Sequence, residues 1–274
     1  MAIIRSCRVE ETPDAFRHLA WQVFFASRGR GVSLDAHFPW LRGGGYDDRS
    51  WLLEADKQPA AMLCTRRGTN SGVNFYAVGL VCTAPAFERR GFATWLLQAA
   101  LEEIGSDVPV LLWTSQHAFY ERFGFTLADP SVVATCTFPT SARTAAAIWQ
   151  RNDWCAEDRY SSCFGGQRGL PTFVTELERW QSVWDPAASL VLRGGAMPIV
   201  LELAASEESV PALLSEIGVP LLMLNLPRPV PLIDRLRAAG VAIDARSTAI
   251  AMWRPGLIDC GALKSLDISL LDRF

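Results

Sequence analysis

Residues 81–97 are the part of the sequence whose residue types and spacing are best suited to chemistry, and they read VCTAPAFERRGFATWLL. Pro85 ends an apolar strand because proline has no N–H to donate to a sheet, and a helix is expected from about Ala93. The peptide N–H groups from Arg89 to Thr94 would therefore lie at the N-terminus of that helix, without partners inside it.

These N–H groups form a site for an anion, because the positive end of the helix dipole lies at the same place. Gly91 has no Cβ, so a phosphate group can approach the backbone closely, and Ala93 is small for the same reason. Arg89 and Arg90 add positive charge. The segment predicts a pyrophosphate ligand. The alternative is a plain turn from strand to helix whose two arginines are solvated.

A second segment, residues 111–125, reads LLWTSQHAFYERFGF and places Tyr120 on a short helix after a buried strand. Gly124 suits the left-handed conformation that ends such a helix. On its own this segment is weak evidence, since Phe-Tyr on a helix is usually part of a core. Together the two segments are stronger evidence, because they lie on successive strand–helix units about 30 residues apart.

Residues 1–138 resemble the GNAT (GCN5-related N-acetyltransferase) superfamily, and these two segments carry the resemblance. The superfamily has the pattern Arg/Gln-x-x-Gly-x-Gly/Ala after its fourth strand, and residues 88–93 read ERRGFA. Its pattern Tyr-Glu-x-x-Gly-Phe appears as YERFGF at residues 120–125. The resemblance implies an α/β fold, with a mixed, mostly antiparallel central sheet and flanking helices. The fourth and fifth strands of that sheet would splay apart to admit acetyl-CoA.

The resemblance also implies roles for individual residues. Tyr120 would be the general acid that protonates the departing CoA thiolate. Acetyl-CoA would be the cosubstrate, bound along its pantetheine arm by backbone groups of the fourth strand and at its pyrophosphate by the loop that follows. The residues implied are Val81, Cys82, Thr83, Arg89, Arg90, Gly91, Phe92, Ala93 and Thr94.

Two positions depart from the pattern of the superfamily. Glu88 stands where Arg or Gln is expected, and a carboxylate near a pyrophosphate is unfavourable unless the neighbouring arginines offset it. The Asn that often follows the fifth strand is also missing, and residues 114–116 read TSQ. Ser115 or Gln116 is left to take its place, and we include Ser115 among the expected cofactor-binding residues.

The reaction implied is transfer of an acetyl group from acetyl-CoA to a primary amine of a small molecule or peptide. A neutral amine attacks the thioester carbonyl directly, so a base or a chain of waters must take a proton from the amine. The N–H groups of Val81–Thr83 are expected to polarise the thioester oxygen. The base stays open among four residues, each of which is also an ordinary loop or hairpin residue: His37, Asp47, Asp48 and Glu54.

Two other functions remain open at this point. The first is a non-catalytic CoA-binding or ligand-sensing protein that uses its second half for interaction. The second is transfer of an acyl group longer than acetyl. The Tyr120 hydroxyl separates an enzyme from a sensor, because only an enzyme needs it as an acid.

The second half of the chain, residues 139–274, lacks both patterns. A strand–helix–glycine–strand run at residues 220–253 echoes residues 110–138, which suggests a duplicated fold, with two unrelated α/β units as the alternative. The echo has no arginine–glycine turn and no tyrosine in its helix. We therefore expect an acetyl-CoA-binding GNAT domain at 1–138 and a degenerate GNAT-like domain at 139–274 that shapes the acceptor site.

Hydrophobic periodicity predicts the elements that position these residues. In the first half we expect strands at Ile3–Val9, Ser50–Glu54, Ala60–Thr65, Phe75–Thr83, Val108–Trp113 and Val132–Phe138, and helices at Asp14–Ala26, Ala93–Ile104 and just before Gly124. In the second half we expect helices at Ser141–Trp154, Thr172–Trp184, Glu207–Ile217 and Val230–Ala239, and strands at Ser189–Arg193, Pro198–Leu203, Pro220–Asn225 and Ala242–Trp253.

Composition excludes several other classes of protein. The net charge is −3, with 26 basic and 29 acidic residues and no basic excess in either half, which disfavours a nucleic-acid partner. No apolar run approaches the ~20 residues that span a bilayer, so no membrane partner is expected. The seven cysteines are scattered without metal-ligand spacing, so we expect no metal and a reduced, cytoplasmic protein. A monomer and a homodimer are both compatible with the sequence.

Overall fold

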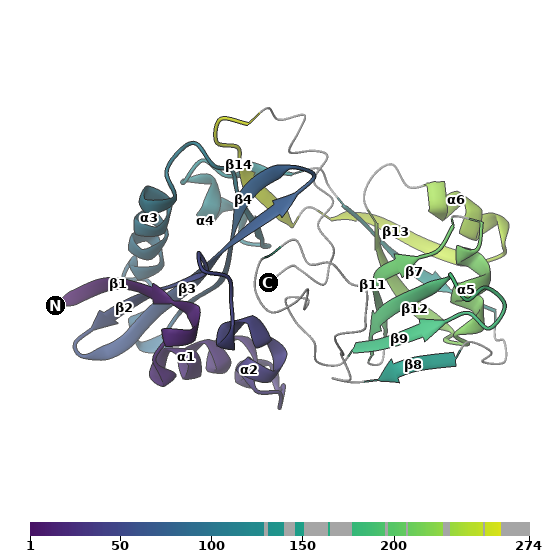
Figure 1. The fold of residues 1–274 in the computed structure, drawn as a ribbon, viewed down its shortest axis with the longest axis horizontal. Helices are drawn as coiled ribbons and strands as arrows, with labels where there is room; N and C mark the ends of the chain where they lie inside the picture. Colours follow the sequence, from purple (N-terminus) through teal and green to yellow (C-terminus); the bar gives the residue numbers. More distant parts are fainter. Residues whose placement is uncertain are drawn as a thin grey trace.

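The chain is described from a computed structural model (Figure 1). The structure describes residues 1–128, 131–139, 146–150, 164, 177–194, 197–206, 208–226, 231–248 and 250–258. Within these residues the chain forms two seven-stranded sheets that lie side by side, with helices packed on each (Figure 1). The expected α/β fold is confirmed.

The first sheet has the strand order β1-β2-β3-β4-β5-β14-β6. All neighbouring strands are antiparallel except β4 and β5, which are parallel. Its strands are β1 (Ala2–Arg8), β2 (Arg49–Ala55), β3 (Gln58–Asn70), β4 (Val73–Thr83), β5 (Val110–Trp113), β6 (Thr126–Leu127) and β14 (Ala251–Arg254). The helices of this half are α1 (Asp14–Phe24), α2 (Leu34–His37), α3 (Phe92–Ile104) and α4 (His117–Glu121), with short 3-10 turns η1 (Val9–Glu11), η2 (Ala26–Arg28), η3 (Pro39–Arg42) and η4 (Pro85–Phe87).

The second sheet has the order β13-β7-β12-β11-β10-β9-β8, in which only β11 and β12 are parallel. Its strands are β7 (Ser131–Thr137), β8 (Ala146–Gln150), β9 (Leu177–Gln181), β10 (Ser189–Arg193), β11 (Ile199–Ala204), β12 (Leu221–Leu226) and β13 (Ala242–Thr248), with helices α5 (Val210–Glu216) and α6 (Pro231–Ala238). Each sheet therefore has one parallel pair, and a helix connects the two strands of the pair in sequence, α3 in the first sheet and α5 in the second. A further strand lies beside the second strand of each pair, β14 beside β5 and β7 beside β12. The internal repeat expected from the sequence is confirmed at the level of topology.

The two halves exchange one strand. β14 comes from the end of the chain but lies between β5 and β6 of the first sheet, and β7 lies between β12 and β13 of the second. The expectation that Val132–Phe138 closes the first half is therefore wrong. The single strand expected at Ala242–Trp253 is also wrong, because β13 and β14 join different sheets. The assignment of residues 1–138 and 139–274 to two domains with different functions stays a prediction. β7 precedes residue 138 but belongs to the second sheet, and β14 follows it but belongs to the first.

Two expected helices are strands. The helix expected at Ser141–Trp154 is contradicted at residues 146–150, which form β8, and the helix expected at Thr172–Trp184 is contradicted at residues 177–181, which form β9. The remaining residues of these two helices lie mostly outside the described part of the chain. β9 pairs with β8 on one side and β10 on the other, and such pairing outweighs the helical spacing of apolar residues in a short segment. The helix expected from Glu207 begins three residues later, at Val210.

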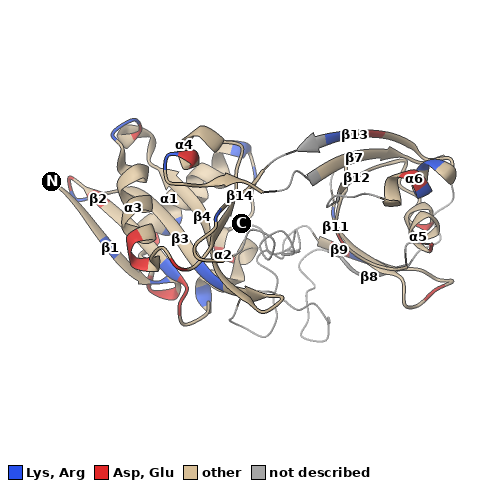
Figure 2. Cartoon of the chain, turned by 90° about the horizontal axis from the view of Figure 1, so that it is seen from above, with Lys and Arg blue, Asp and Glu red and all other residues tan. Residues whose placement is uncertain are grey.

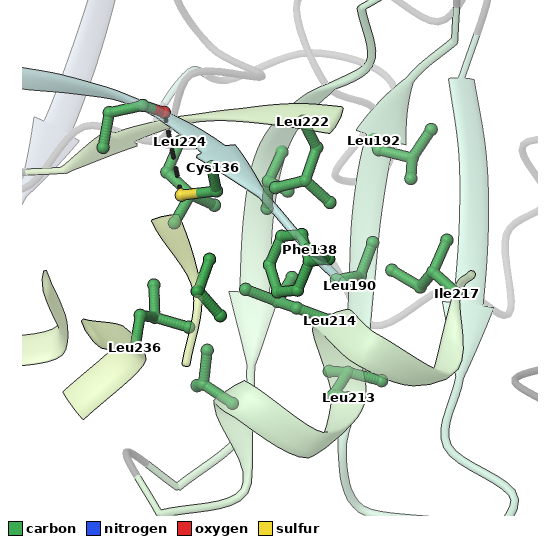
Figure 3. Close-up of a cluster of buried hydrophobic side chains, with 14 of the residues drawn as sticks. Cys136, Phe138, Leu190, Leu192, Leu213, Leu214, Ile217, Leu222, Leu224 and Leu236 are labelled. Carbon is green, nitrogen blue, oxygen red and sulfur yellow. Dashed lines mark hydrogen bonds between the residues drawn. The ribbon is translucent and has the colours of Figure 1, made fainter. Parts of the chain in front are cut away.

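Each sheet buries its own hydrophobic core. In the second half, β7, β10 and β12 face α5 and α6, and Figure 3 shows Phe138, Leu190 and Leu222 pointing toward Leu214 of α5. In the first half the two faces of the sheet carry separate cores, one under α1 and one under α3. Leu177 and Val191 of the second half join the core under α1, so the two halves share apolar packing.

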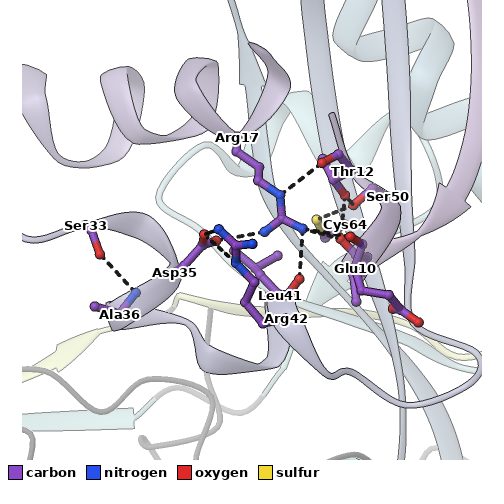
Figure 4. A network of polar contacts seen from close by, with 11 residues as sticks. Glu10, Thr12, Arg17, Ser33, Asp35, Ala36, Leu41, Arg42, Ser50 and Cys64 are labelled. Atoms are coloured by element: carbon purple, nitrogen blue, oxygen red, sulfur yellow. Dashed lines mark hydrogen bonds and ion pairs between the residues drawn. The ribbon is translucent and has the colours of Figure 1, made fainter. Parts of the chain in front are cut away.

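A buried arginine of α1 binds the helical turns on both sides of it in the sequence (Figure 4). Arg17 of α1 is 7% exposed, and its guanidinium donates to the carbonyl oxygens of Thr12, Val9 and Leu41 at 2.9–3.0 Å. It also pairs with Asp35 of α2 at 2.7 Å. This one side chain therefore fixes η1, α2 and η3 relative to α1.

Charged residues of both signs are interspersed over both halves (Figure 2). Among the helices of the described residues, none is long and apolar enough to cross a membrane.

Candidate functional site

The parallel strands β4 and β5 separate soon after they meet. Their ladder consists of two pairs, Tyr76 with Val110 and Ala77 with Leu111. Beyond Ala77, the segment Val78–Thr83 has its ladder partners in β3 alone, so its other edge carries backbone groups unused by the described strands. The separation of the fourth and fifth strands, which the resemblance implied, is confirmed at β4 and β5. The result is a free strand edge that faces a gap in the sheet.

β4 contains a bulge within this free segment. Cys64 pairs with Gly79 and Met62 pairs with Cys82, so β4 has one more residue than β3 between these two pairs. Leu80 lies in the bulge with φ +51°, a conformation that leucine adopts only when the surrounding structure enforces it. Leu80 and Cys82 pack in the core under α1, whereas Val81 packs against the core under α3. The bulge therefore turns the backbone beside Val81, where a bound group would find N–H donors.

The N-terminus of α3 is open. Gly91 precedes the helix with φ +78°, and no side chain caps the helix there. The first α-helical hydrogen bond runs from Trp95 N to Gly91 O at 3.0 Å, which leaves the N–H groups of Phe92, Ala93 and Thr94 without a helical partner. A Cβ built on Gly91 would meet no atom within 4 Å. The glycine is therefore needed for its backbone angle and not to avoid a clash of its side chain.

The charged residues of this loop point away from the core. Glu88, Arg89 and Arg90 are all exposed. Arg89 has φ +62°, and the Arg90 guanidinium lies over the Phe87 ring at 5.3 Å. Glu88 follows η4 with an extended backbone, so its carboxylate belongs to the loop before α3 and not to the first turn of that helix. The loop presents two arginines and one carboxylate to solvent around the helix N-terminus.

Tyr120 lies on α4 and is 8% exposed. Its ring packs edge-on against Phe119 at 4.8 Å and Phe125 at 6.0 Å. Burial raises the pKa of Tyr120 to about 12, and neither a charge nor a hydrogen bond of a described residue contributes to the shift. The hydroxyl therefore keeps its proton throughout the neutral range, as a general acid must. Gly124 has φ +82° and ends the helical turn as expected.

Both helices begin at the same edge of the sheet. α3 follows the C-terminal end of β4 through η4, and α4 follows the C-terminal end of β5. Because β4 and β5 are parallel, both ends point toward the same edge of the sheet, beyond the two pairs at which the strands are joined. Ser115 is exposed in the turn before α4, where Thr114 Oγ1 accepts a hydrogen bond from Gln116 N at 2.9 Å. The fold thus gathers the free β4 edge, the open helix and the segment of Tyr120 on one side.

Two of the four candidate bases are already engaged in ion pairs. Asp48 is 1% exposed and accepts hydrogen bonds from Arg66 Nε at 2.9 Å, Gly45 N and Arg67 N. Burial raises the pKa of its carboxyl, and the Arg66 guanidinium opposes that shift. Asp47 pairs with the Arg67 guanidinium at 2.9 Å. Asp48 is therefore a structural group, and it holds the loop before β2 on β3.

The other two candidates differ in their surroundings. His37 is 5% exposed between the rings of Phe25 and Phe38. Burial and the nearby Arg30 and Arg193 lower its pKa to about 3, so it is a very weak base. Glu54 is half-buried in β2, opposite Ile3 of β1. The assignment of the base stays open.

The aromatic rings around Arg66 could not be expected from the sequence. Its guanidinium lies 4.6 Å from the Trp40 ring centre and 4.4 Å from that of Phe164, in addition to its pair with Asp48. Gly68 of β3 also forms an isolated bridge with Phe164, so a residue of the second half covers the end of β3. No local pattern marks these contacts, because the partners come from three distant segments.

Among the described residues, no group of three or more histidine, cysteine, aspartate or glutamate side chains is placed to hold a metal ion. Cys7, Cys64, Cys82 and Cys136 are free thiols.

Residues 47–127 match the family model described as an acetyltransferase (GNAT) domain. This match covers β2 to β6, which is the part of the chain that contains the open helix and Tyr120. This part of the chain is therefore similar to the GNAT superfamily of acetyltransferases. Acyl transfer is the general activity of this superfamily. No curated protein matches the sequence.

Solved structures with the same fold include several GNAT proteins. A probable N-acyltransferase from Enterococcus faecalis is 12% identical with a TM-score of 0.62, and the match covers 92% of this chain and 72% of that one. A GCN5-related N-acetyltransferase from Anabaena variabilis is 13% identical with a TM-score of 0.63, over 95% and 74% of the two chains. A tandem GNAT protein from the clavulanic acid biosynthesis pathway is 11% identical with a TM-score of 0.52, over 92% and 98%.

The last of these matches spans both halves of the chain. At such low identity it shows the fold alone, and that fold is a GNAT domain followed by a second GNAT-like domain. It agrees with the repeated strand order of the two sheets.

Proposed function

We propose that the chain is an N-acetyltransferase that moves an acetyl group from acetyl-CoA to a primary amine of a small molecule or peptide. The observation that carries the proposal is the separation of β4 and β5 after two pairs, beside a helix whose N-terminus is open. A free strand edge suits the pantetheine arm, whose amides can pair with it as an added strand would. The free N–H groups of α3 suit the pyrophosphate.

The residues that would hold acetyl-CoA follow from this arrangement. Backbone groups of Val81, Cys82 and Thr83 would pair with the pantetheine arm. The pyrophosphate would lie on the N–H groups from Gly91 to Thr94, with Arg89 and Arg90 nearby to offset its charge and that of Glu88. Ser115, at the start of α4, would lie along the opposite wall.

The reaction proceeds by direct attack. The amine nitrogen forms a bond to the thioester carbon, and the carbonyl electrons move to oxygen, where the N–H groups beside the Leu80 bulge stabilise the negative charge. When the carbonyl re-forms, the bond to sulfur breaks and the thiolate takes the proton of the Tyr120 hydroxyl. The proton lost by the amine goes to a base or water chain that is not assigned. Tyr120 then recovers its proton from solvent.

The second half is proposed to be a degenerate copy that cannot bind CoA in the same way. Residues 208–209 precede α5 without an arginine or glycine, and α6, which corresponds to α4, contains no tyrosine. Its strands β9 and β10 contribute Leu177 and Val191 to the core under α1. We therefore propose that it shapes the acceptor side of the first half. The free thiols support a reduced, cytoplasmic protein.

Calorimetric titration of acetyl-CoA into the wild-type chain and into Gly91→Glu tests the binding step. A matched control is Gly29→Glu, because Gly29 follows η2 in the same left-handed conformation, with φ +68° and ψ +17° against φ +78° and ψ +9° at Gly91, and has equally free space. Both variants suffer the same kind of backbone strain, but only the first places a carboxylate on the proposed pyrophosphate site. Micromolar binding that is lost in Gly91→Glu and kept in Gly29→Glu supports the proposal. Absence of binding to the wild type would contradict it.

A further inference from the structure

A row of aromatic rings runs along the loop and the first turn of α3. The Phe87 and Phe92 rings lie 6.0 Å apart, and the Phe92 and Trp95 rings lie 5.4 Å apart. Phe87 and Phe92 are each 7% exposed, whereas Trp95 is 48% exposed. The row therefore begins in the core and ends with an indole that is half open to solvent.

Trp95 does not belong to the core face of its helix. That face consists of Phe92, Leu96, Leu97, Ala100 and Leu101, all buried against the sheet. An isolated exposed tryptophan would need no explanation. Here its position matters, because Trp95 N bonds to Gly91 O, which places the backbone of Trp95 one helical turn after Gly91. Side chains on a helix lean toward its N-terminus, which is where the proposed pyrophosphate site lies.

The same row carries a positive charge at its other end. The Arg90 guanidinium lies over the Phe87 ring at 5.3 Å, and this contact holds it near the helix N-terminus. An exposed aromatic ring and a cation that contacts a ring of the same row thus both lie close in sequence to the proposed phosphate-binding turn. A nucleotide presents the matching groups, a flat base and additional phosphate charge.

We propose that Trp95 is a positioning residue that stacks on the adenine of the acyl-CoA donor, while Arg90 pairs with the phosphates of its nucleotide. The inference rests on the proposed function. Bases stack on aromatic side chains through their faces, and such contacts strengthen binding without a hydrogen bond to the base. Adenine is far from the thioester, so the contact acts equally before and during the reaction and changes affinity rather than kcat.

The stacking has a consequence for the choice of donor. An acyl group carried on the 4′-phosphopantetheine arm of a carrier protein has no adenine and no second phosphate of the pyrophosphate. The same thioester in free acyl-CoA has both. The enzyme should therefore prefer free acyl-CoA, and Trp95 should account for part of that preference.

The test uses two probes and three variants of the full chain. The probes are acetyl-CoA and S-acetyl-4′-phosphopantetheine, which share the thioester but differ in the nucleotide. The variants are Trp95→Ala, Trp95→Phe, which keeps a ring, and Gln98→Ala, an exposed residue in the next turn of the same helix. Circular dichroism and thermal unfolding confirm that each variant is folded.

The expected result is a loss of at least about fivefold in acetyl-CoA affinity for Trp95→Ala, with a smaller loss for Trp95→Phe and none for Gln98→Ala. Affinity for S-acetyl-4′-phosphopantetheine should stay unchanged in all three variants. In addition, 3′,5′-ADP alone should quench part of the tryptophan fluorescence of the wild type, and this part should be absent in Trp95→Phe.

The outcomes separate this inference from the proposed function. If the wild type binds acetyl-CoA and Trp95→Ala binds it equally well, the stacking is wrong and the proposed function stands. If Trp95→Ala weakens both probes equally, Trp95 supports the helix and not the adenine, and the inference is again overturned. If the wild type binds neither probe, the proposed function fails and this inference fails with it.

Discussion

Trp253 of β14 pairs with Leu111 of β5, across 142 positions of sequence. The neighbouring Met252 is 1% exposed within the core under α3. A strand from the end of the second half thus completes the sheet of the first half, next to the strand that borders the candidate site. The two halves are therefore coupled in folding as well as in sequence.

This coupling predicts that a fragment of residues 1–138 does not fold cooperatively by itself. It would lack β14, which would expose the edge of β5, and it would carry an unpaired β7. Residues 1–128 joined through a flexible linker to residues 250–258 should recover a cooperative unfolding transition, which circular dichroism can follow. A fragment 1–138 with the same thermal midpoint as the full chain would contradict this account of the fold.

Arg17 and Arg42 both bind Asp35, but their removal should have very different effects. The Arg17 side chain is 8% exposed and also donates to four carbonyl oxygens, whereas the Arg42 side chain is 65% exposed. Arg17→Ala should lower the free energy of unfolding by at least about 3 kcal/mol because buried acceptors lose their donors. Arg42→Ala should cost less than about 1 kcal/mol. Urea denaturation measures both, and similar losses would show that the buried network adds little.

His37 should make the chain less stable in mild acid. Its folded pKa of about 3 lies below the ordinary value of 6.5, so between these limits the unfolded chain binds a proton that the folded chain does not. The free energy of unfolding should therefore fall as the pH drops from about 6.5, by up to about 1.4 kcal/mol per pH unit from this residue. Urea denaturation between pH 4 and 7 measures the slope. His37→Gln should flatten it, and exposed His18→Gln should not.

Burial of Tyr120 predicts that the chain also becomes less stable in alkali, because here the free energy of unfolding falls as the pH rises. Its pKa is raised to about 12 from an ordinary value of 10, so the unfolded chain loses this proton first as the pH rises. The stability that the neutral phenol contributes is present below pH 10 and is lost between about pH 10 and 12. Absorbance of tyrosinate should show one tyrosine that titrates last, and this signal should be missing in Tyr120→Phe. A normal titration of all tyrosines would show that Tyr120 is not buried.

The local backbone conformation at the candidate site was more predictable from the sequence than the fold around it. Gly91 and Tyr120 follow from short local patterns, because a helix N-terminus and the turn after a strand are made by neighbouring residues. The structure also confirms the separation of β4 and β5, which the resemblance implied. β8 and β9 were expected to be helices because their apolar spacing was ambiguous over few residues, and pairing with distant strands decided their conformation.

The strand exchange and the setting of Arg66 could not be predicted in this way. Ala242–Trp253 contains no proline or glycine that would mark a break, so nothing within it shows that β13 and β14 belong to different sheets. Arg66 contacts Asp48, Trp40 and Phe164, which meet only in the folded chain. Such contacts depend on topology, which a local pattern does not contain.

The most direct test of the central claim is the rate of acetyl transfer from acetyl-CoA to a panel of primary amines, measured by mass spectrometry for the wild type and Tyr120→Phe. Tyr46→Phe, a change at a residue that is 75% exposed, is the matched control. We predict that the wild type and Tyr46→Phe acetylate the same amine at the same rate. Tyr120→Phe should bind acetyl-CoA equally well but lose about 100-fold or more in kcat at neutral pH. An unchanged kcat in Tyr120→Phe would contradict its role as the acid, and binding of acetyl-CoA without transfer to any amine would favour a sensor over an enzyme.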